Sequence, residues 1–281
     1  MNTAKINKRF KHILLNIITW LAVFLVIFPL LWMFLSSIKH NTEIFASPPT
    51  IISKDPTLTN FIELFKLTSF ERYFLNSLIV TALTIIITIV IATLTAYTFS
   101  RFKIKGSGFL SRIYIFIYLI PQIALIIPVF LTFRYLHLQD KLIGLVLVYL
   151  ITTFPYSFLM LRSYIGSISK EMEEAAMVDG CSRFTAFIRI ILPIAVPGIV
   201  ATSIFSAVIC WNEFLFSFIL ISTDSKKTLT VGVAQMTDMT VIPSWGMLMA
   251  AGVIVLIPMI IFFIAIQKRL VVGLSAGAVK G

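Results

Sequence analysis

Residues 75–98 read LNSLIVTALTIIITIVIATLTAYT, a run that contains no charged side chain. About 20 mostly apolar residues are enough for an α-helix to cross the hydrocarbon core of a bilayer. Five other stretches meet the same criterion, at about 13–35, 109–133, 142–164, 194–221 and 246–266. The sequence therefore predicts an all-α membrane protein with six transmembrane helices.

The overall composition agrees with a membrane protein. Hydrophobic residues make up 59% of the 281 residues, charged residues only 12%, and the mean hydropathy is +1.00. A soluble domain carries about twice that share of charge, which excludes an ordinary soluble enzyme and a disordered chain. The formal net charge of +11 would suggest a nucleic-acid partner on a soluble protein. Membrane proteins instead collect Lys and Arg on their cytoplasmic loops, so no nucleic-acid partner is expected here.

The basic residues also predict an orientation. With the N-terminus placed inside, the inner segments hold 15 Lys and Arg and the outer segments hold 8. This bias favours a multi-pass protein of the cell membrane with both termini in the cytoplasm. The first outer loop, about 36–74, carries Pro48, Pro49 and Pro56 with mixed charge and is expected to form a small external structure.

The inner loop at 165–193 is predicted to fold as a helix, a turn and a second helix. Ser169 can cap a first helix over about 170–178, and Ser182 can cap a second, since serine is a preferred N-cap residue. Gly180 lies between them and tolerates the positive φ that often ends a helix. Ala175 and Ala176 leave a low patch beside acidic side chains, a shape suited to a partner's groove. The composition alone is more typical of an ordinary solvated loop helix.

A specific motif favours the docking interpretation. Residues 174–180 read EAAMVDG, and Ile190, Leu192 and Pro193 follow. This closely resembles the EAA loop of binding-protein-dependent ABC importer permeases, in which E-A-A, three residues and G are followed by I-x-L-P. Every position of that pattern is filled, and the loop precedes the fifth predicted span, as in the family.

Two further stretches resemble the carbohydrate branch of that family, and its MalG-like subunits in particular. Residues 211–214, WNEF, resemble the W-N-E-[FY] run of carbohydrate-importer permeases. The C-terminal GLSAGAVKG, residues 273–281, resembles their GLTAGAVKG tail, with Ser275 in place of the usual Thr. The likeness covers about residues 76–281, whereas the first span and first outer loop match only in layout.

The resemblance implies a type I ABC importer permease fold and a role in coupling. It divides the chain into an N-terminal span with its external loop (1–73) and a permease core (74–281) that includes the coupling loop (165–193) and a C-terminal tail (267–281). The EAA loop would dock in a cleft of the cytoplasmic ATPase, with Glu174 paired to a basic or polar group and Gly180 setting the turn. The residues assigned to this coupling are Glu174, Ala175, Ala176, Asp179, Gly180, Leu192 and Pro193. The tail residues Ala276, Gly277 and Lys280 would reach between the ATPase subunits.

The resemblance also implies partners. These are a second homologous permease, an ATPase dimer, an extracytoplasmic solute-binding protein and the membrane lipid. The sequence holds no G-x-x-x-x-G-K-[ST] segment, so another polypeptide must bind the ATP, and the chain is not expected to be an enzyme. No cofactor or metal is expected, because His12, His40 and His137 all fall at or beyond the ends of apolar runs.

A few polar residues inside the predicted spans are candidates for the translocation path. Glu213 is the one acid well inside a span, where a charge costs about 2.5–3.5 kcal/mol. It must therefore face a cavity, a partner or the outer interface. An indole can stack on a sugar ring, and amide and carboxylate groups can bind its hydroxyls. The candidate path residues are Trp211, Asn212, Glu213, Gln122 and Tyr156, and for each of them a structural role is the alternative.

Two other function classes are weaker. An ion-coupled secondary transporter usually needs several ionisable groups inside the membrane, and this chain offers chiefly Glu213. An intramembrane serine protease needs a Ser–His pair within the bilayer, and no predicted span holds a histidine. The sequence leaves the solute open among saccharides, glycerol phosphodiesters and other polyols.

Overall fold

The computed structural model describes residues 3–237 and 244–278, and every regular element within those residues is a helix. Five helices there are long and apolar enough to cross a membrane, and a bent pair brings the number to six. The α-helices are α1 (Thr3–Ser37), α2 (Asn41–Ile44), α3 (Thr59–Leu67), α4 (Phe70–Arg101), α5 (Ser107–Leu119), α6 (Ile126–Tyr135), α7 (Leu142–Ser167), α8 (Lys170–Val178), α9 (Arg183–Ala186), α10 (Leu192–Asn212), α11 (Leu215–Leu220), α12 (Leu229–Gln235) and α13 (Trp245–Ala278).

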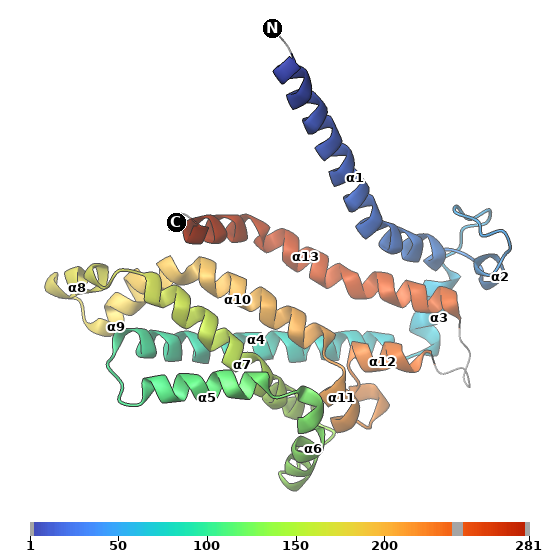
Figure 1. Cartoon of the computed structure of the whole chain (residues 1–281). Helices are drawn as coiled ribbons and strands as arrows, with labels where there is room; N and C mark the ends of the chain where they lie inside the picture. The colour runs from blue at the N-terminus through green and yellow to red at the C-terminus, as the bar shows by residue number, and fades with distance from the viewer. Residues whose placement is uncertain (1–2, 238–243, 279–281) are drawn as a thin grey trace. The chain divides into compact units, whose positions relative to one another are not determined.

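The chain divides into two compact units. The first comprises residues 1–68 and 235–257, and the second comprises residues 69–234 and 258–281. The second unit is built around α4, α7 and α10, which pack against one another, with α5 packed against α7. In Figure 1, α8 and α9 lie at one end of this bundle and α11 lies at the other.

Small polar side chains hold the three central helices close together. Thr88 of α4 and Thr153 of α7 share a hydrogen bond of 2.9 Å, and Ser157 of α7 and Ser206 of α10 share one of 3.0 Å. All four side chains are buried. Small residues let helix backbones approach closely, and hydroxyl pairs between helices add stability within a bilayer. The opposite face of α4 is exposed and apolar, which suits contact with lipid.

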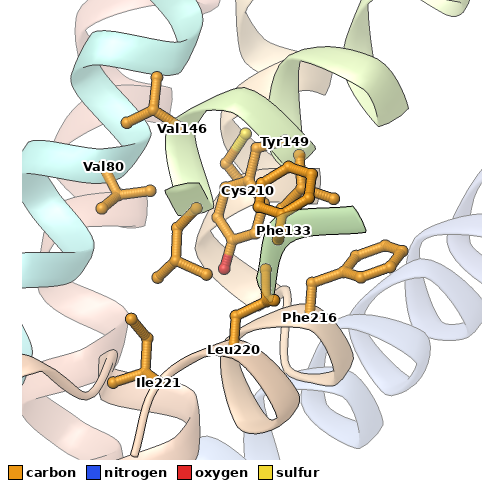
Figure 2. Packing of buried hydrophobic residues seen from close by; sticks show 10 residues of the cluster. Val80, Phe133, Val146, Tyr149, Cys210, Phe216, Leu220 and Ile221 are labelled. Carbon is orange, nitrogen blue, oxygen red and sulfur yellow. The ribbon is translucent and has the colours of Figure 1, made fainter. Parts of the chain in front are cut away.

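An apolar cluster fills the bundle near α11. Figure 2 shows Tyr149 of α7 and Cys210 of α10 in this cluster, with Val80 of α4 and Phe216 and Leu220 of α11 around them. Each of these side chains is at most 4% exposed. The cluster therefore fixes the short helix α11 onto the three long helices.

The third predicted span is not one straight helix. Helix α5 ends at Leu119, a 3₁₀ turn covers Gln122–Leu125, and α6 begins at Ile126, with a bend of 93° between the two arms. Pro121 is the physical cause, because a residue that precedes proline is driven from the helical to the extended region. Ile120 has the expected extended ψ of 124°.

The fifth predicted span also differs at both ends. Helix α9 and the π-helical segment Phe187–Ile191 run directly into α10, so the helix begins before Pro193. The π segment accommodates the missing N–H of that proline within a continuous helix. At its other end α10 stops at Asn212, and α11 is a separate short helix. The predicted continuation to residue 221 is therefore wrong.

The first outer loop is ordered within the first unit. The Asn60 amide donates to the carbonyls of Ser37 and Lys39, both at 2.8 Å, and so ties α3 to the end of α1. The Glu43 carboxylate accepts hydrogen bonds from the Thr50 hydroxyl and the Ser53 hydroxyl. The loop thus forms a small ordered structure, and its place outside the membrane stays a prediction.

A charged clamp joins two loops of the second unit near α11. Asp140 accepts hydrogen bonds from the Thr223 backbone at 2.9 Å and from its hydroxyl at 2.7 Å, and it pairs with Lys226 at 2.8 Å. Burial alone raises the pKa of Asp140, but the hydrogen bonds from Lys226 and Thr223 lower it more. The pKa of Asp140 therefore lies well below its ordinary value.

This shift predicts a pH-dependent effect of Asp140→Asn. The pKa of Asp140 is lower in the folded protein than its value of 3.8 in the unfolded chain. The ionised carboxylate therefore stabilises the fold fully at pH values above 3.8, and this stabilisation is lost as the pH falls toward the folded-state pKa. The variant should therefore unfold at a lower temperature than the wild type, by a constant margin from neutral pH down to about 5, and the margin should shrink in stronger acid. Thermal unfolding of the detergent-solubilised protein measures this margin.

The matched control for that experiment is Asp55→Asn. The Asp55 side chain is 88% exposed and lies 3.5 Å from His40, so its replacement should change the unfolding temperature little. Asparagine also tolerates the positive φ of 54° found at residue 140, so Asp140→Asn removes charge without adding backbone strain. A margin that grew on acidification would contradict the clamp.

Candidate functional site

The two short helices of the inner loop are capped as their sequence predicts. The Ser169 hydroxyl accepts a hydrogen bond of 3.2 Å from the Glu171 N–H at the start of α8. The Ser182 hydroxyl accepts one of 3.2 Å from the Thr185 N–H at the start of α9. Each cap satisfies an N–H group that has no partner inside the helix, so the start of each helix is set locally.

Gly180 ends α8 in a left-handed turn. Its φ is +89°, and its N–H donates to the Met177 carbonyl at 3.1 Å. The Cys181 N–H donates to the Ala176 carbonyl at 3.0 Å, which completes a Schellman motif. The prediction of a positive φ at Gly180 is confirmed. The turn gives α9 a fixed direction relative to α8.

Helix α8 has one exposed face and one buried face. Glu174, Ala175 and Val178 are exposed, and Asp179 and Gly180 extend this surface past the end of the helix. Val178 is 87% exposed, and Phe184 of α9 is 70% exposed. The exposed face of α8 thus combines acidic groups with the apolar side chain of Val178, and α9 exposes Phe184. Ala176 is only 8% exposed and lies on the opposite face, where it packs inside the chain.

The buried face carries an ion pair that the sequence reasoning missed. Glu173 accepts a hydrogen bond from Arg101 Nε at 2.9 Å, and the two side chains are 5% and 3% exposed. The Tyr97 hydroxyl donates to the other oxygen of the same carboxylate. Helical spacing could have indicated that Glu173 is buried, because Glu173 and Ala176 are three residues apart and lie on the same face of α8. Its partner Arg101 lies 72 residues away, which no local pattern reveals.

The remaining coupling candidates lie where the loop joins α10. Leu192 is half-buried and Pro193 is exposed, and both begin α10 directly after the π-helical segment. A π segment inside a helix often marks a functional site. Ala276 and Gly277 lie in the last turn of α13, which runs to Ala278. Lys280 lies outside the described residues, and the tail's contacts stay a prediction.

Two of the candidate path residues are buried within this chain. Trp211 is 4% exposed and meets Phe74 of α4 edge-to-face at 5.9 Å. Glu213 is 8% exposed and lies in the break between α10 and α11. Its carboxylate accepts hydrogen bonds from the N–H groups of Phe216 at 2.7 Å and Ser217 at 3.1 Å. The carboxylate therefore caps α11, where the helix dipole favours a negative charge.

The other three candidates lie on α7, on α10 and in the bend after α5, where Tyr156 is half-buried and the other two are exposed. Gln122 lines a pocket of about 310 Å³ together with Thr152 and Pro155 of α7 and Ile209 of α10. Tyr156 stacks on Phe205 of α10, with ring centroids 3.7 Å apart. Asn212 is exposed, and its amide donates to the Val208 carbonyl at 2.8 Å. Gln122 and Thr152 are thus the polar members of a pocket lining that is otherwise apolar.

Comparison with known proteins places these features in context. Residues 88–275 match the family described as "Binding-protein-dependent transport system inner membrane component". The chain is 38% identical over 268 residues to the probable ABC transporter permease protein YurM of Bacillus subtilis, which covers 93% of this chain and 88% of that protein. It is 34% identical over 257 residues to the diacetylchitobiose uptake system permease protein DasC of Streptomyces coelicolor, with coverage of 91% and 92%.

A solved structure shares the fold. A chain of a bacterial ABC transporter involved in the import of the acidic polysaccharide alginate superposes with a TM-score of 0.82. The match covers 93% of this chain and 97% of that one, at 20% sequence identity.

Proposed function

Because this chain belongs to the family of binding-protein-dependent transport system inner membrane components, we propose that it forms one half of the translocation path of an ATP-driven sugar importer. It is a multi-pass inner-membrane protein with the fold of an ABC importer permease. The observation that carries the proposal is the exposed face of α8, held at the end of the bundle by a serine cap before it and the Gly180 turn after it.

The coupling role of α8 follows from its shape and chemistry. A capped two-turn helix presents Glu174 and Ala175 outward, with Val178 beside the rigid turn at Gly180. An apolar side chain that is 87% exposed, rimmed by acids, fits a groove with an apolar floor and basic edges. The partner is a cytoplasmic ATPase dimer, whose closure on ATP would push this face. This chain contains no phosphate-binding glycine loop of its own, so hydrolysis belongs to that partner.

The solute is proposed to be a sugar or a sugar-like polyol. One relative is named for the uptake of diacetylchitobiose, and the WNEF run resembles that of carbohydrate-importer permeases. An external solute-binding protein delivers the solute, and a second homologous permease completes the path. Both termini of this chain then lie in the cytoplasm, with α8 on the same side of the membrane.

The path is proposed to follow the face of α7 and α10 rather than the face of α4. Gln122, Thr152 and Tyr156 supply an amide, a hydroxyl and a phenol along that face, and the exposed face of α4 is apolar. Sugars need hydrogen-bonding groups and aromatic planes, whereas lipid needs neither. In this assignment Asn212 belongs to the path. Trp211 and Glu213 do not line the path in this assignment. Trp211 packs on Phe74 and Glu213 binds the α11 backbone, and both contacts hold the path-lining helices in place.

Thr152→Trp should therefore block transport. An indole at this position fills much of the pocket that Gln122 lines, so uptake should fall by about tenfold or more while basal ATP hydrolysis remains. The control is Ile86→Trp on the exposed face of α4, which should leave uptake close to that of the wild type. Equal inhibition by both substitutions would argue against this path.

Reconstitution tests the function itself. Proteoliposomes that contain this chain, a second permease and an ATPase should take up a labelled oligosaccharide when ATP and the binding protein are present. Liposomes with this chain alone should take up none. A proton ionophore at constant ATP should have no effect. Uptake by the chain alone, or its loss on addition of ionophore, would support an ion-coupled transporter instead.

A further inference from the structure

We propose that Arg101, Glu173 and Tyr97 form a joint that transmits the movement of α8 to the membrane-spanning helix α4. This inference rests on the proposed function and adds positioning residues that lie outside the EAA pattern. In this proposal the two adjacent glutamates of α8 have different roles. Glu174 faces the partner, and Glu173 holds the membrane span.

The joint spans three elements of the second unit. Arg101, the last residue of α4, donates from Nε to Glu173 of α8 at 2.9 Å and from Nη2 to the carbonyl of Ile168 at 3.0 Å. Ile168 is the C-cap residue of α7, and only Ser169 separates it from α8. One guanidinium therefore holds both sides of the α7–α8 junction.

Tyr97 extends the joint to the fifth span. Its hydroxyl donates to Glu173, and its ring packs on Phe187 with centroids 4.5 Å apart. Phe187 begins the π-helical segment that leads into α10. A displacement of α8 therefore moves α4 through the hydrogen bonds of the Glu173 carboxylate. It moves α10 through the contact between the Tyr97 and Phe187 rings. Coupling between distant sites is carried by such packed and hydrogen-bonded chains.

The junction would otherwise be loose. Ile168 has an extended ψ of 128°, so α7 ends there and α8 starts in a new direction. Ile168 and Ser169 alone connect these two helices, and α8 can swing about this short link. The ion pair lies on the far side of α8 from its exposed acids and removes this freedom. A displacement of the exposed face of α8 then moves α4 as well, instead of only bending the link between α7 and α8.

Stability alone is a poor explanation for this ion pair. A buried pair stabilises a fold only if its remaining donors are also satisfied, and replacement of such a pair by apolar residues is often neutral. Arg101 Nη1 is buried and has no hydrogen-bond partner within residues 3–237 and 244–278. A partly satisfied pair of this kind is better explained by a mechanical role.

The test replaces both charges at once. Arg101→Met with Glu173→Met roughly keeps the volume and removes the link without leaving a lone buried charge. In the reconstituted four-component importer the double variant should still assemble and hydrolyse ATP, but solute carried per ATP should fall by about tenfold or more. The matched control is Arg112→Met, which removes an exposed arginine of α5, outside the coupling loop and the joint. Wild-type transport per ATP in the double variant would overturn the proposal.

A distance measurement tests whether α8 and α4 move together even if the double variant fails to assemble. Spin labels at Met172→Cys and Thr98→Cys, both exposed positions, report the separation of α8 and the end of α4. Cys181 is replaced by serine in this background, and Cys210 is buried. In the importer with wild-type Arg101 and Glu173, the distance should stay the same with and without ATP. A nucleotide-dependent change would overturn the joint. Failure of the unmodified importer to show ATP-driven uptake would instead refute the proposed function.

Discussion

Gly180→Val is expected to reduce ATP-dependent uptake by about tenfold or more while the protein still inserts into the membrane. Gly180 has a φ of +89°, a conformation that costs an L-residue about 1–2 kcal/mol and a β-branched one more. No atom lies within 4 Å of the position that a Cβ would occupy, so the effect is conformational strain rather than a clash. A cost of about 1.4 kcal/mol lowers the equilibrium constant for forming the native turn roughly tenfold. Solute uptake and ATP hydrolysis are both measured in proteoliposomes, and their ratio reports the coupling.

Gly106 supplies a matched control for this substitution. It has a φ of +82°, lies in the loop between α4 and α5, and also has no atom within 4 Å of the place where a Cβ would lie. Gly106→Val thus carries the same backbone cost outside the coupling loop and should leave transport per ATP unchanged. Gly180→Asn, which accepts a positive φ, should retain most of the activity. Normal transport by Gly180→Val would contradict the coupling role of the turn.

Glu213→Ala is expected to destabilise the second unit by about 3 kcal/mol, since each hydrogen bond to a charged group contributes roughly 1.5–3 kcal/mol. The carboxylate is buried and accepts from the N–H groups of Phe216 and Ser217. Without it these two donors are left unpaired at the start of α11, beside the apolar cluster of Figure 2. The denaturation midpoint in detergent and the yield of folded protein should both fall.

Asn212→Ala is the control for Glu213, because the two residues are adjacent and differ in environment. Asn212 is exposed and donates only within its own helix turn, to the Val208 carbonyl. Its loss should leave the denaturation midpoint nearly unchanged and weaken solute transport. The opposite pattern, a stable Glu213→Ala protein with an altered KM for the solute, would place Glu213 in direct contact with the sugar.

The sequence predicts those parts of the fold that local chemistry determines. Apolar runs with at most one charged residue locate the membrane spans. The hydroxyls of Ser169 and Ser182 bind N–H groups two or three residues away. The turn at Gly180 follows from the backbone freedom of glycine. These features need no information from distant residues, so the helices and the turn of the inner loop can be predicted almost to the residue.

Other features depend on residues far apart in the chain. Pro121 accounts for the break in the third span, but no local sequence pattern gives the angle of 93° between its two arms. The apolar run from 194 to 221 hides the break at Glu213, because the acid itself starts a new helix inside that run. The link from Glu173 to Arg101 crosses 72 residues, and the pairing of these two charges exists only in the folded bundle.

The most direct test of the account asks what contacts the exposed face of α8. A photo-activated cross-linker is placed at Ala175, an exposed residue of α8, in the assembled importer. The account predicts a covalent product with the ATPase subunit, with a yield that changes when ATP binds. A second cross-linker at Lys105, an exposed residue of the other inner loop, controls for proximity alone. If Ala175 reacted only with water in an importer that is transporting solute, α8 would not be the coupling element.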